Sequence, residues 1–210
     1  MKFEELLAII DGRPVFNSGL LRAGDVDTVD IASQLSRWVN SGRLIQLRRG
    51  VYALPEEYRS RAPHPFEVAN LLVRPSYVSL ESALSYHGVI PEAVFTATSV
   101  TSARADEFLT PLGAYSFRHI ASRFFWGYTT ETVSGAESFV ARPEKALLDL
   151  VYLRPGAGAR SFLHELRLAP GSLDLDALAA MAARWGRPKL QRAAELTAAL
   201  MSEAGEWEEL

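Results

Sequence analysis

Apolar residues recur every three or four positions near the start of the chain and predict three helices. The first ten residues form an amphipathic helix that Gly12 and Pro14 end. A short second helix is expected around residues 18–23. The third and longest helix has Asp27 as its N-cap and ends at Gly42. Its apolar face consists of Ile31, Leu35, Trp38 and Val39.

Two short runs typical of strands follow the third helix, at residues 44–47 and 51–54, and predict a β-hairpin. Arg48, Arg49 and Gly50 connect them. Three helices followed by a hairpin is the order of a winged helix-turn-helix, in which the third helix enters the major groove of DNA. We therefore predict a winged helix-turn-helix DNA-binding domain over residues 1–61.

The rest of the chain predicts a larger mixed α/β domain over residues 66–210, so the fold class is α+β. A polar stretch punctuated by prolines separates it from the first domain. Short strands and helices follow, among them a helix that begins at Pro143 with Glu144 in its first turn. The alanine-rich region from about residue 171 to 210 has apolar residues at helical spacing on both sides of a Gly-Arg-Pro break. This pattern predicts a C-terminal helical hairpin.

The polar face of the third helix is composed as a DNA-reading surface would be. Asn, Gln and Arg side chains can make bidentate contacts to base edges, and arginines at a hairpin tip can contact phosphates. The residues that we expect to contact DNA are Thr28, Ser33, Gln34, Arg37, Asn40, Arg48 and Arg49.

Net charge makes any nucleic-acid site a local patch. The chain has 22 basic and 25 acidic residues, a formal charge of −3, which excludes a polybasic protein. Residues 1–61 hold nine basic and eight acidic residues, a weak balance for DNA binding unless a dimer doubles the phosphate contacts. A winged helix that docks a protein partner therefore remains an alternative.

Composition also excludes several classes of protein. The chain contains no cysteine, so disulfides, thiolate zinc sites and cysteine nucleophiles are excluded. Its longest apolar run, residues 177–183, is far shorter than the roughly 20 residues that cross a bilayer. The N-terminus lacks the order of a signal peptide, and we expect a cytoplasmic protein without membrane binding.

Three blocks of sequence together resemble the AbiEi family, the antitoxins of type IV (abortive infection) toxin–antitoxin systems. They are Arg-Gly-Val-Tyr-Ala-Leu at 49–54, Tyr-Val-Ser-Leu-Glu-Ser-Ala-Leu at 77–84 and Ala-Arg-Pro-Glu-Lys-Ala-Leu-Leu-Asp at 141–149. The resemblance covers roughly residues 1–170.

This resemblance implies a transcriptional repressor of phage-defence genes. Such a protein binds inverted repeats in its own double-stranded promoter DNA, where a two-fold site would fit a dimer, and counteracts a nucleotidyltransferase-like toxin through its C-terminal domain. The resemblance maps the recognition helix onto residues 28–41 and the wing onto residues 46–52. It transfers no catalytic residue, and we expect no cofactor and no metal.

A metal-dependent nuclease is a less favoured alternative. It would need Glu81, Glu144, Lys145 and Asp149 to share one site. Asp149 lies five residues beyond Glu144, about 140° around a helix, so we expect the two carboxylates to face apart. Glu144 and Lys145 are expected to begin and solvate their helix.

Other candidate groups carry weaker signals. Ser79 and His87 could be a nucleophile and its base, but no third group is indicated and Ser79 is well placed as a helix N-cap. The four histidines lack paired metal-ligand spacing. The aromatic residues at 124–128 favour a core position over base stacking.

A third function is a transcriptional regulator that senses a small ligand and has no toxin partner. Its sign would be an apolar pocket around Tyr77, Phe95 and Trp126.

Overall fold

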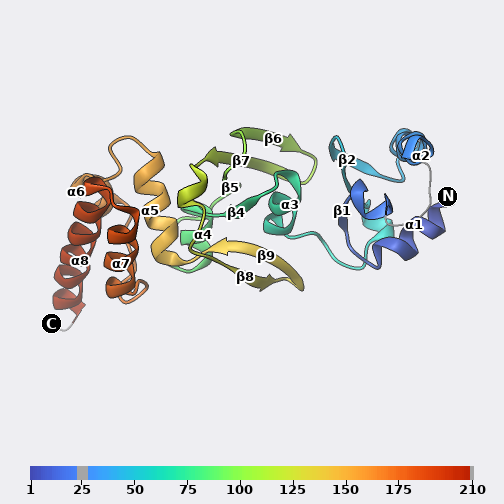
Figure 1. Ribbon diagram of the computed structural model, residues 1–210. Coiled ribbons are helices and arrows are strands. Elements are labelled where there is room, and N and C mark those ends of the chain that lie inside the picture. The colour runs from blue at the N-terminus through green and yellow to red at the C-terminus, as the bar shows by residue number, and fades with distance from the viewer. Residues whose placement is uncertain (23–27, 209–210) are drawn as a thin grey trace.

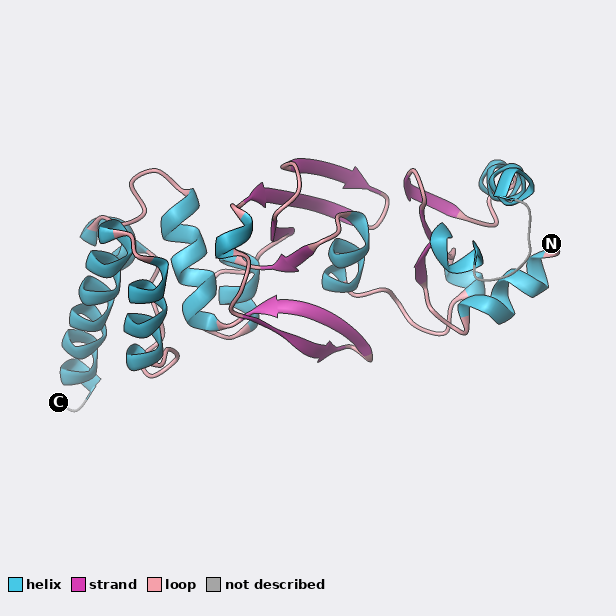
Figure 2. Ribbon diagram, viewed as in Figure 1, coloured by secondary structure: helices cyan, strands magenta, loops and turns pink. Residues whose placement is uncertain are grey.

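The computed structural model describes residues 1–22 and 28–208, and the side chains of 1–21 and 31–203 within them. The molecule is elongated, with its two termini at opposite ends (Figure 1). An N-terminal unit, a central sheet with its helices and a C-terminal helix pair follow one another along its length (Figure 2). The α+β class and the closing helix pair are confirmed.

The N-terminal unit combines helices with a small antiparallel sheet of order β1-β3-β2. Its elements are α1 (Phe3–Ile10), β1 (Val15–Asn17), the 3-10 helix η1 (Ser18–Arg22), α2 (Thr28–Asn40), β2 (Ile45–Arg48) and β3 (Val51–Ala53). The predicted helices and hairpin are present. Strand β1 was not expected, because its three residues between Pro14 and Ser18 are too few to show alternation.

Strands β1 and β3 of this small sheet are buried on both faces. Phe16 and Tyr52 stack with their ring centroids 5.8 Å apart and belong to the apolar cluster that contains α1 and α2. Val15, Leu47 and Val51 point the other way and belong to the cluster of the central sheet. The alternation along β1 and β3 therefore joins the N-terminal unit to the rest of the molecule.

The connection between the two units is irregular but held in place. It contains the 3-10 helix η2 (Glu56–Tyr58), and the Tyr58 ring lies edge-on to Phe3 of α1, with centroids 5.0 Å apart. Arg61 then makes a bidentate pair with Glu67, with nitrogen–oxygen distances of 2.8 and 2.9 Å. The proline-rich stretch is thus a connection fixed at both ends.

A mixed sheet of order β6-β7-β5-β4-β9-β8 forms the centre of the molecule. Its strands are β4 (Ser76–Val78), β5 (Thr96–Thr101), β6 (Asp106–Thr110), β7 (Gly113–His119), β8 (Tyr128–Val133) and β9 (Ala136–Ala141). The accompanying helices are α3 (Pro65–Leu72), α4 (Leu80–Tyr86), the 3-10 helix η3 (Ser122–Phe124) and α5 (Pro143–Leu153).

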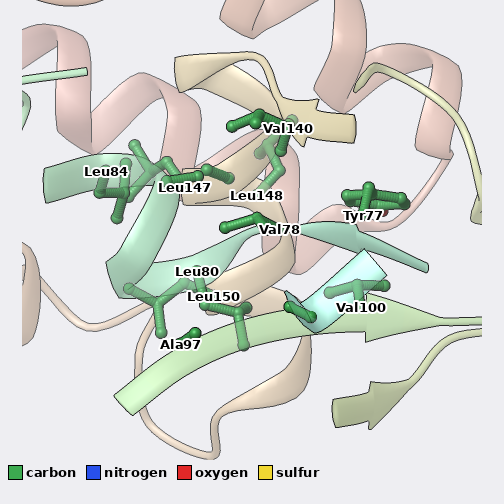
Figure 3. Packing of buried hydrophobic residues seen from close by; sticks show 14 of the residues in the cluster. Tyr77, Val78, Leu80, Leu84, Ala97, Val100, Val140, Leu147, Leu148 and Leu150 are labelled. Carbon is green, nitrogen blue, oxygen red and sulfur yellow. The ribbon is translucent and has the colours of Figure 1, made fainter. Parts of the chain in front are cut away.

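Helices pack on the inner strands and close the main core. α3 packs against β4, β5 and β9, whereas α4 packs against β5 and α5. Val78 of β4 and Val140 of β9 are register partners, and their side chains gather with those of Leu147 and Leu148 from α5 (Figure 3). As predicted, α5 begins with Pro143 at its first position.

Helices alone make up the C-terminal end: α6 (Arg160–Glu165), α7 (Leu175–Trp185) and α8 (Pro188–Glu208). α7 and α8 pack side by side, and Gly186, with φ +68°, ends α7. Trp185 is buried against Phe124 and Tyr152, at centroid distances of 5.1 and 5.3 Å. None of the helices in the described part of the chain is long and apolar enough to span a membrane.

Candidate nucleic-acid interface

The polar face of α2 is open to solvent. Ser33, Arg37 and Asn40 are exposed and Gln34 is half-buried. Ser33, Arg37 and Asn40 follow one another at intervals of about one helical turn, and Gln34 lies beside Ser33, so the helix presents a continuous polar strip. The strip is at the end of the molecule furthest from the C-terminal helices (Figure 1).

Packing on the opposite face fixes the orientation of α2. Ile31, Leu35 and Trp38 are buried, and the Trp38 ring lies edge-on to Phe3 with centroids 5.4 Å apart. The helix ends where Gly42 adopts φ +76°. Rotation of the strip away from solvent would expose these apolar side chains.

The hairpin tip carries two exposed arginines, Arg48 and Arg49. Gly50 has φ +81°, a conformation that favours glycine, and its carbonyl accepts a hydrogen bond of 2.8 Å from the Ser18 amide. Neither arginine pairs with a carboxylate in the described ranges. Both guanidinium groups are therefore placed to bind an anion.

One of these arginines also contacts the central sheet. The Arg48 guanidinium carbon lies 5.8 Å from the ring centroid of Phe108 on β6, within the range of a cation–π contact. Its neighbour Leu47 is buried in the central cluster. The hairpin tip is thus exposed along one side and supported along the other.

Two of the sequence predictions fall at the edge of what is described. Asp27, expected as the N-cap, lies outside the described residues. Thr28 begins α2, but its side chain also lies outside the described part of the structure.

Two exposed polar residues, of which Gln46 lies in the predicted wing, were not among the residues predicted to contact DNA. Arg43 follows the turn after α2, with its guanidinium carbon 5.4 Å from the Phe3 ring centroid, and Gln46 is exposed on β2. Their position in the sequence, between the predicted third helix and the hairpin tip, could have indicated that they belong to the same surface.

A second polar cluster is fully buried beneath the central sheet. Lys145 Nζ donates to Tyr77 Oη (2.8 Å) and to Asp149, whose Oδ2 accepts from Tyr77 Oη (3.0 Å) and Ser79 Oγ (2.8 Å). These four side chains have no solvent exposure. Lys145 Nζ also lies 4.3 Å from the Trp185 ring centroid.

Burial governs the titration of this cluster. Loss of solvent raises the pKa of the Asp149 carboxyl and lowers that of the Lys145 ammonium, and their mutual attraction opposes both shifts. Burial, with the Asp149 carboxylate beside it, raises the pKa of the Tyr77 hydroxyl. The hydrogen bonds to Asp149 offset part of the cost of desolvation.

This cluster corrects two predictions about α5 and α4. Glu144 and Lys145 do not solvate their helix, because both side chains are buried. Lys145 pairs with Asp149 one turn further along α5, and Glu144 Oε1 accepts a hydrogen bond from the Asp174 amide (2.9 Å). Ser79 occupies the N-cap position of α4, but its hydroxyl donates to Asp149 and not to the helix.

The carboxylates needed by a nuclease do not converge. Glu144 accepts from the Asp174 amide at the start of α7, and Asp149 lies in the buried cluster. Glu81 Oε1 is 3.6 Å from Arg154 Nη1. Among the described residues, no three His, Asp or Glu side chains are grouped as metal ligands. His87 Nε2 lies 2.8 Å from the carbonyl of Ala141, so Ser79 is not its partner.

The three aromatic residues suggested for a ligand pocket are dispersed. Tyr77 is buried, Phe95 is 94% exposed beside β6, and Trp126 lies near Arg184 and Trp185. Phe95 and Trp126 line two different pockets, and Tyr77 lines neither of them.

Comparison with known families identifies the segment that carries the strip and the hairpin. Residues 15–55 match the family described as "Transcriptional regulator, AbiEi antitoxin". This matched stretch, the AbiEi segment, is similar to a regulator domain of that antitoxin family. The AbiEi segment runs from β1 to just beyond β3 and contains each residue predicted to contact DNA. The sequence blocks at 77–84 and 141–149 lie outside it.

A solved structure shares the overall fold. The crystal structure of the RV2827C protein from Mycobacterium tuberculosis aligns over 92% of this chain and 75% of its own, with a TM-score of 0.54 and 17% sequence identity. The likeness therefore extends well beyond the AbiEi segment, and at this identity it is a likeness of fold. No curated protein matches the chain.

Proposed function

We propose that the protein is a transcriptional regulator of the antitoxin kind that binds duplex DNA. In this proposal residues 1–61 are a winged helix-turn-helix domain and residues 66–210 are the antitoxin domain. The observation that carries it is the exposed polar strip of α2 next to a hairpin with two arginines that have no carboxylate partner in the described ranges.

Each part of this surface has a distinct role. The strip of α2, with Thr28 at its start and Ser33, Gln34, Arg37 and Asn40 along it, reads base edges in the major groove. Arg48 and Arg49 bind phosphates and set the register of the protein on the duplex. From residue 28 to residue 54 the chain has four basic residues and one acidic residue, so this segment is more basic than the whole.

The hairpin is tested with the double variant Arg48→Ala/Arg49→Ala. Binding to the promoter fragment upstream of the gene is measured by gel shift over a series of salt concentrations. We expect weaker binding and a slope of log K against log salt that is shallower by about two, because about one counterion is released per phosphate contact.

The control is Arg104→Ala/Arg192→Ala, which removes the same charge from two exposed arginines elsewhere. It should leave the salt slope near that of the parent protein. Equal salt slopes for the parent protein and both double variants would show that the hairpin arginines do not contact phosphates.

The remaining parts of the proposal concern regulation and the partner. The protein acts in the cytoplasm, binds inverted repeats in its own promoter as a dimer and represses transcription. Its second domain counteracts a nucleotidyltransferase-like toxin without catalysis of its own. The antitoxin family of the N-terminal segment supports this assignment.

Co-expression tests the antitoxin role. The chain, and a variant unable to bind DNA, are each expressed with the product of the adjacent gene. Both should restore growth if the second domain neutralises the toxin, and toxicity unchanged by either protein would contradict the proposal.

A further inference from the structure

A large cleft lies where the N-terminal unit meets the central sheet. Its volume is about 970 Å³, within the range of cavities that hold small molecules. One wall comes from β1, η1 and Arg13, which lies two residues before β1. The other comes from α3, the α3–β4 turn with Arg74, and the β8–β9 hairpin.

The central-sheet side of the cleft provides an aromatic wall. Phe125, Tyr128 and Phe139 line it, with centroid distances of 5.3 Å between the first two rings and 5.9 Å between the last two. Phe139 is 47% exposed. A flat apolar ring of a ligand could pack against this wall in the offset or edge-on geometry that aromatic groups favour.

Contacts behind the wall fix its shape. Tyr128 stacks on the buried ring of Tyr77, with centroids 4.7 Å apart and planes inclined by 15°. The Phe139 amide donates to Asn70 Oδ1 on α3 (2.6 Å). A site whose wall is already ordered loses less entropy on binding than one that must form around its ligand.

Each wall of the cleft carries an exposed arginine. Arg13 and Arg74 are exposed and have no ion-pair partner in the described ranges, and Arg74 Nε is 3.4 Å from the carbonyl of Asn70. Of the acidic residues in the lining, Glu67 is already engaged by Arg61, which leaves Glu137 against the two arginines. The local excess of positive charge favours an anion.

We propose that this cleft binds a small aromatic anion. The ring of the ligand packs on Phe139 and Tyr128, and its acidic group accepts hydrogen bonds from Arg13 and Arg74. Because these arginines come from opposite walls, the ligand bridges the N-terminal unit and the central sheet. A nucleotide and an aromatic carboxylic acid both have this chemistry.

A bridging ligand would regulate the DNA-binding surface. It adds contacts across the same junction that positions β1 and the hairpin, and it therefore stabilises one arrangement of α2 relative to the second unit. This regulatory consequence rests on the proposed function. The binding site itself does not, since it can be measured without DNA.

Calorimetric titration of the full chain tests the site. The probes are adenosine monophosphate and benzoate, each compared with a compound that lacks its charge, adenosine and benzyl alcohol, and with inorganic phosphate. We expect one of the two anions to bind saturably and to do so about tenfold or more tightly than its uncharged counterpart and than phosphate. Which anion binds distinguishes a nucleotide site from an aromatic-acid site.

Variants locate the binding. Arg13→Ala/Arg74→Ala should weaken the anion that binds by about tenfold or more, and Phe139→Ala should also weaken it. Arg104→Ala/Arg192→Ala, with the same loss of charge away from the cleft, should not. Failure of both anions to saturate at millimolar concentration, or equal binding by the arginine pair variant and its control, would overturn the proposal.

The two proposals fail separately. A chain that binds the anion but not the promoter fragment would retain the site and lose the proposed DNA function. A chain that binds the promoter fragment but neither anion would do the opposite.

Discussion

Lys145 and Asp149 illustrate how individual residues determine this fold. A lysine and an aspartate four positions apart are usually a solvated pair on a helix surface, worth a few tenths of a kcal/mol. Here the pair has no exposure and holds hydroxyls from β4 and the start of α4. The pair therefore joins α5 to β4, one of the two middle strands of the sheet.

Removal of one partner should cost more than removal of both charges. Lys145→Met leaves the Asp149 carboxylate buried without its counter-charge, and we expect the free energy of unfolding to fall by about 3–5 kcal/mol. Lys145→Met/Asp149→Asn keeps an acceptor for Tyr77 and Ser79 and should recover part of the loss. Urea denaturation measures both, and a double variant less stable than the single one would contradict this account.

The stability of the single variant should also depend on pH. Burial already raises the pKa of Asp149, and loss of Lys145 removes the group that lowers it. The folded state then retains the carboxyl proton at pH values where the unfolded chain, with a pKa near about 3.9, has lost it. The deficit of Lys145→Met relative to the double variant should shrink as pH falls from 7 towards about 4. A deficit independent of pH would show that Asp149 is not the cause.

At the scale of elements, local signals predicted the helices and the hairpin and missed the short or polar pieces. Pro143 at the first position and Gly42 after the last turn marked helix ends in the sequence. β6 begins with Asp106 and Glu107 at the edge of the sheet, where solvent covers one side, so its composition is that of a loop. α6 is only six residues long.

The candidate interface was more predictable than the buried cluster. Exposure of Ser33, Arg37 and Asn40 follows from the period of one helix, because Leu35 and Trp38 define the buried face. Burial of Lys145 depends on Tyr77, 68 positions away in the sequence. Spacing within a helix carries no information on such a partner.

α2 and the hairpin should differ in what they contribute to DNA binding. Ser33→Ala/Asn40→Ala removes two uncharged groups from the strip, so it should lower affinity for the promoter fragment by about 1–3 kcal/mol per lost base contact without a change in salt slope. Gel shifts with promoter and unrelated fragments measure this. A parallel loss on both fragments would argue against base reading by the strip.

At the scale of the whole molecule, the two-sided small sheet ties the N-terminal unit to the central one. Val15 and Val51 are almost completely buried in the central cluster, whereas Phe16 and Tyr52 face the helices. A strand with one solvated face would alternate apolar and polar residues, and β3, which is buried at all three positions, does not. The second apolar face exists because the second unit covers it.

A fragment of residues 1–61 should therefore be unstable in solution as a monomer. Its uncovered face, which includes Val15, Leu47 and Val51, should promote self-association and binding of a hydrophobic dye. Sedimentation and dye fluorescence compare it with the whole chain, and Leu47→Gln/Val51→Thr in the fragment should reduce both effects. A monomeric fragment that binds no dye would show that the junction is dispensable.

The contact between Arg48 and Phe108 has a consequence for energetics. A phosphate that draws this guanidinium from the ring must replace an attraction of roughly 0.5–1 kcal/mol at an exposed site. The ring belongs to the outermost strand of the central sheet, far along the chain from the hairpin. The central sheet thus competes with the duplex for Arg48. This competition lowers the affinity for DNA below the value that the hairpin tip would have without Phe108.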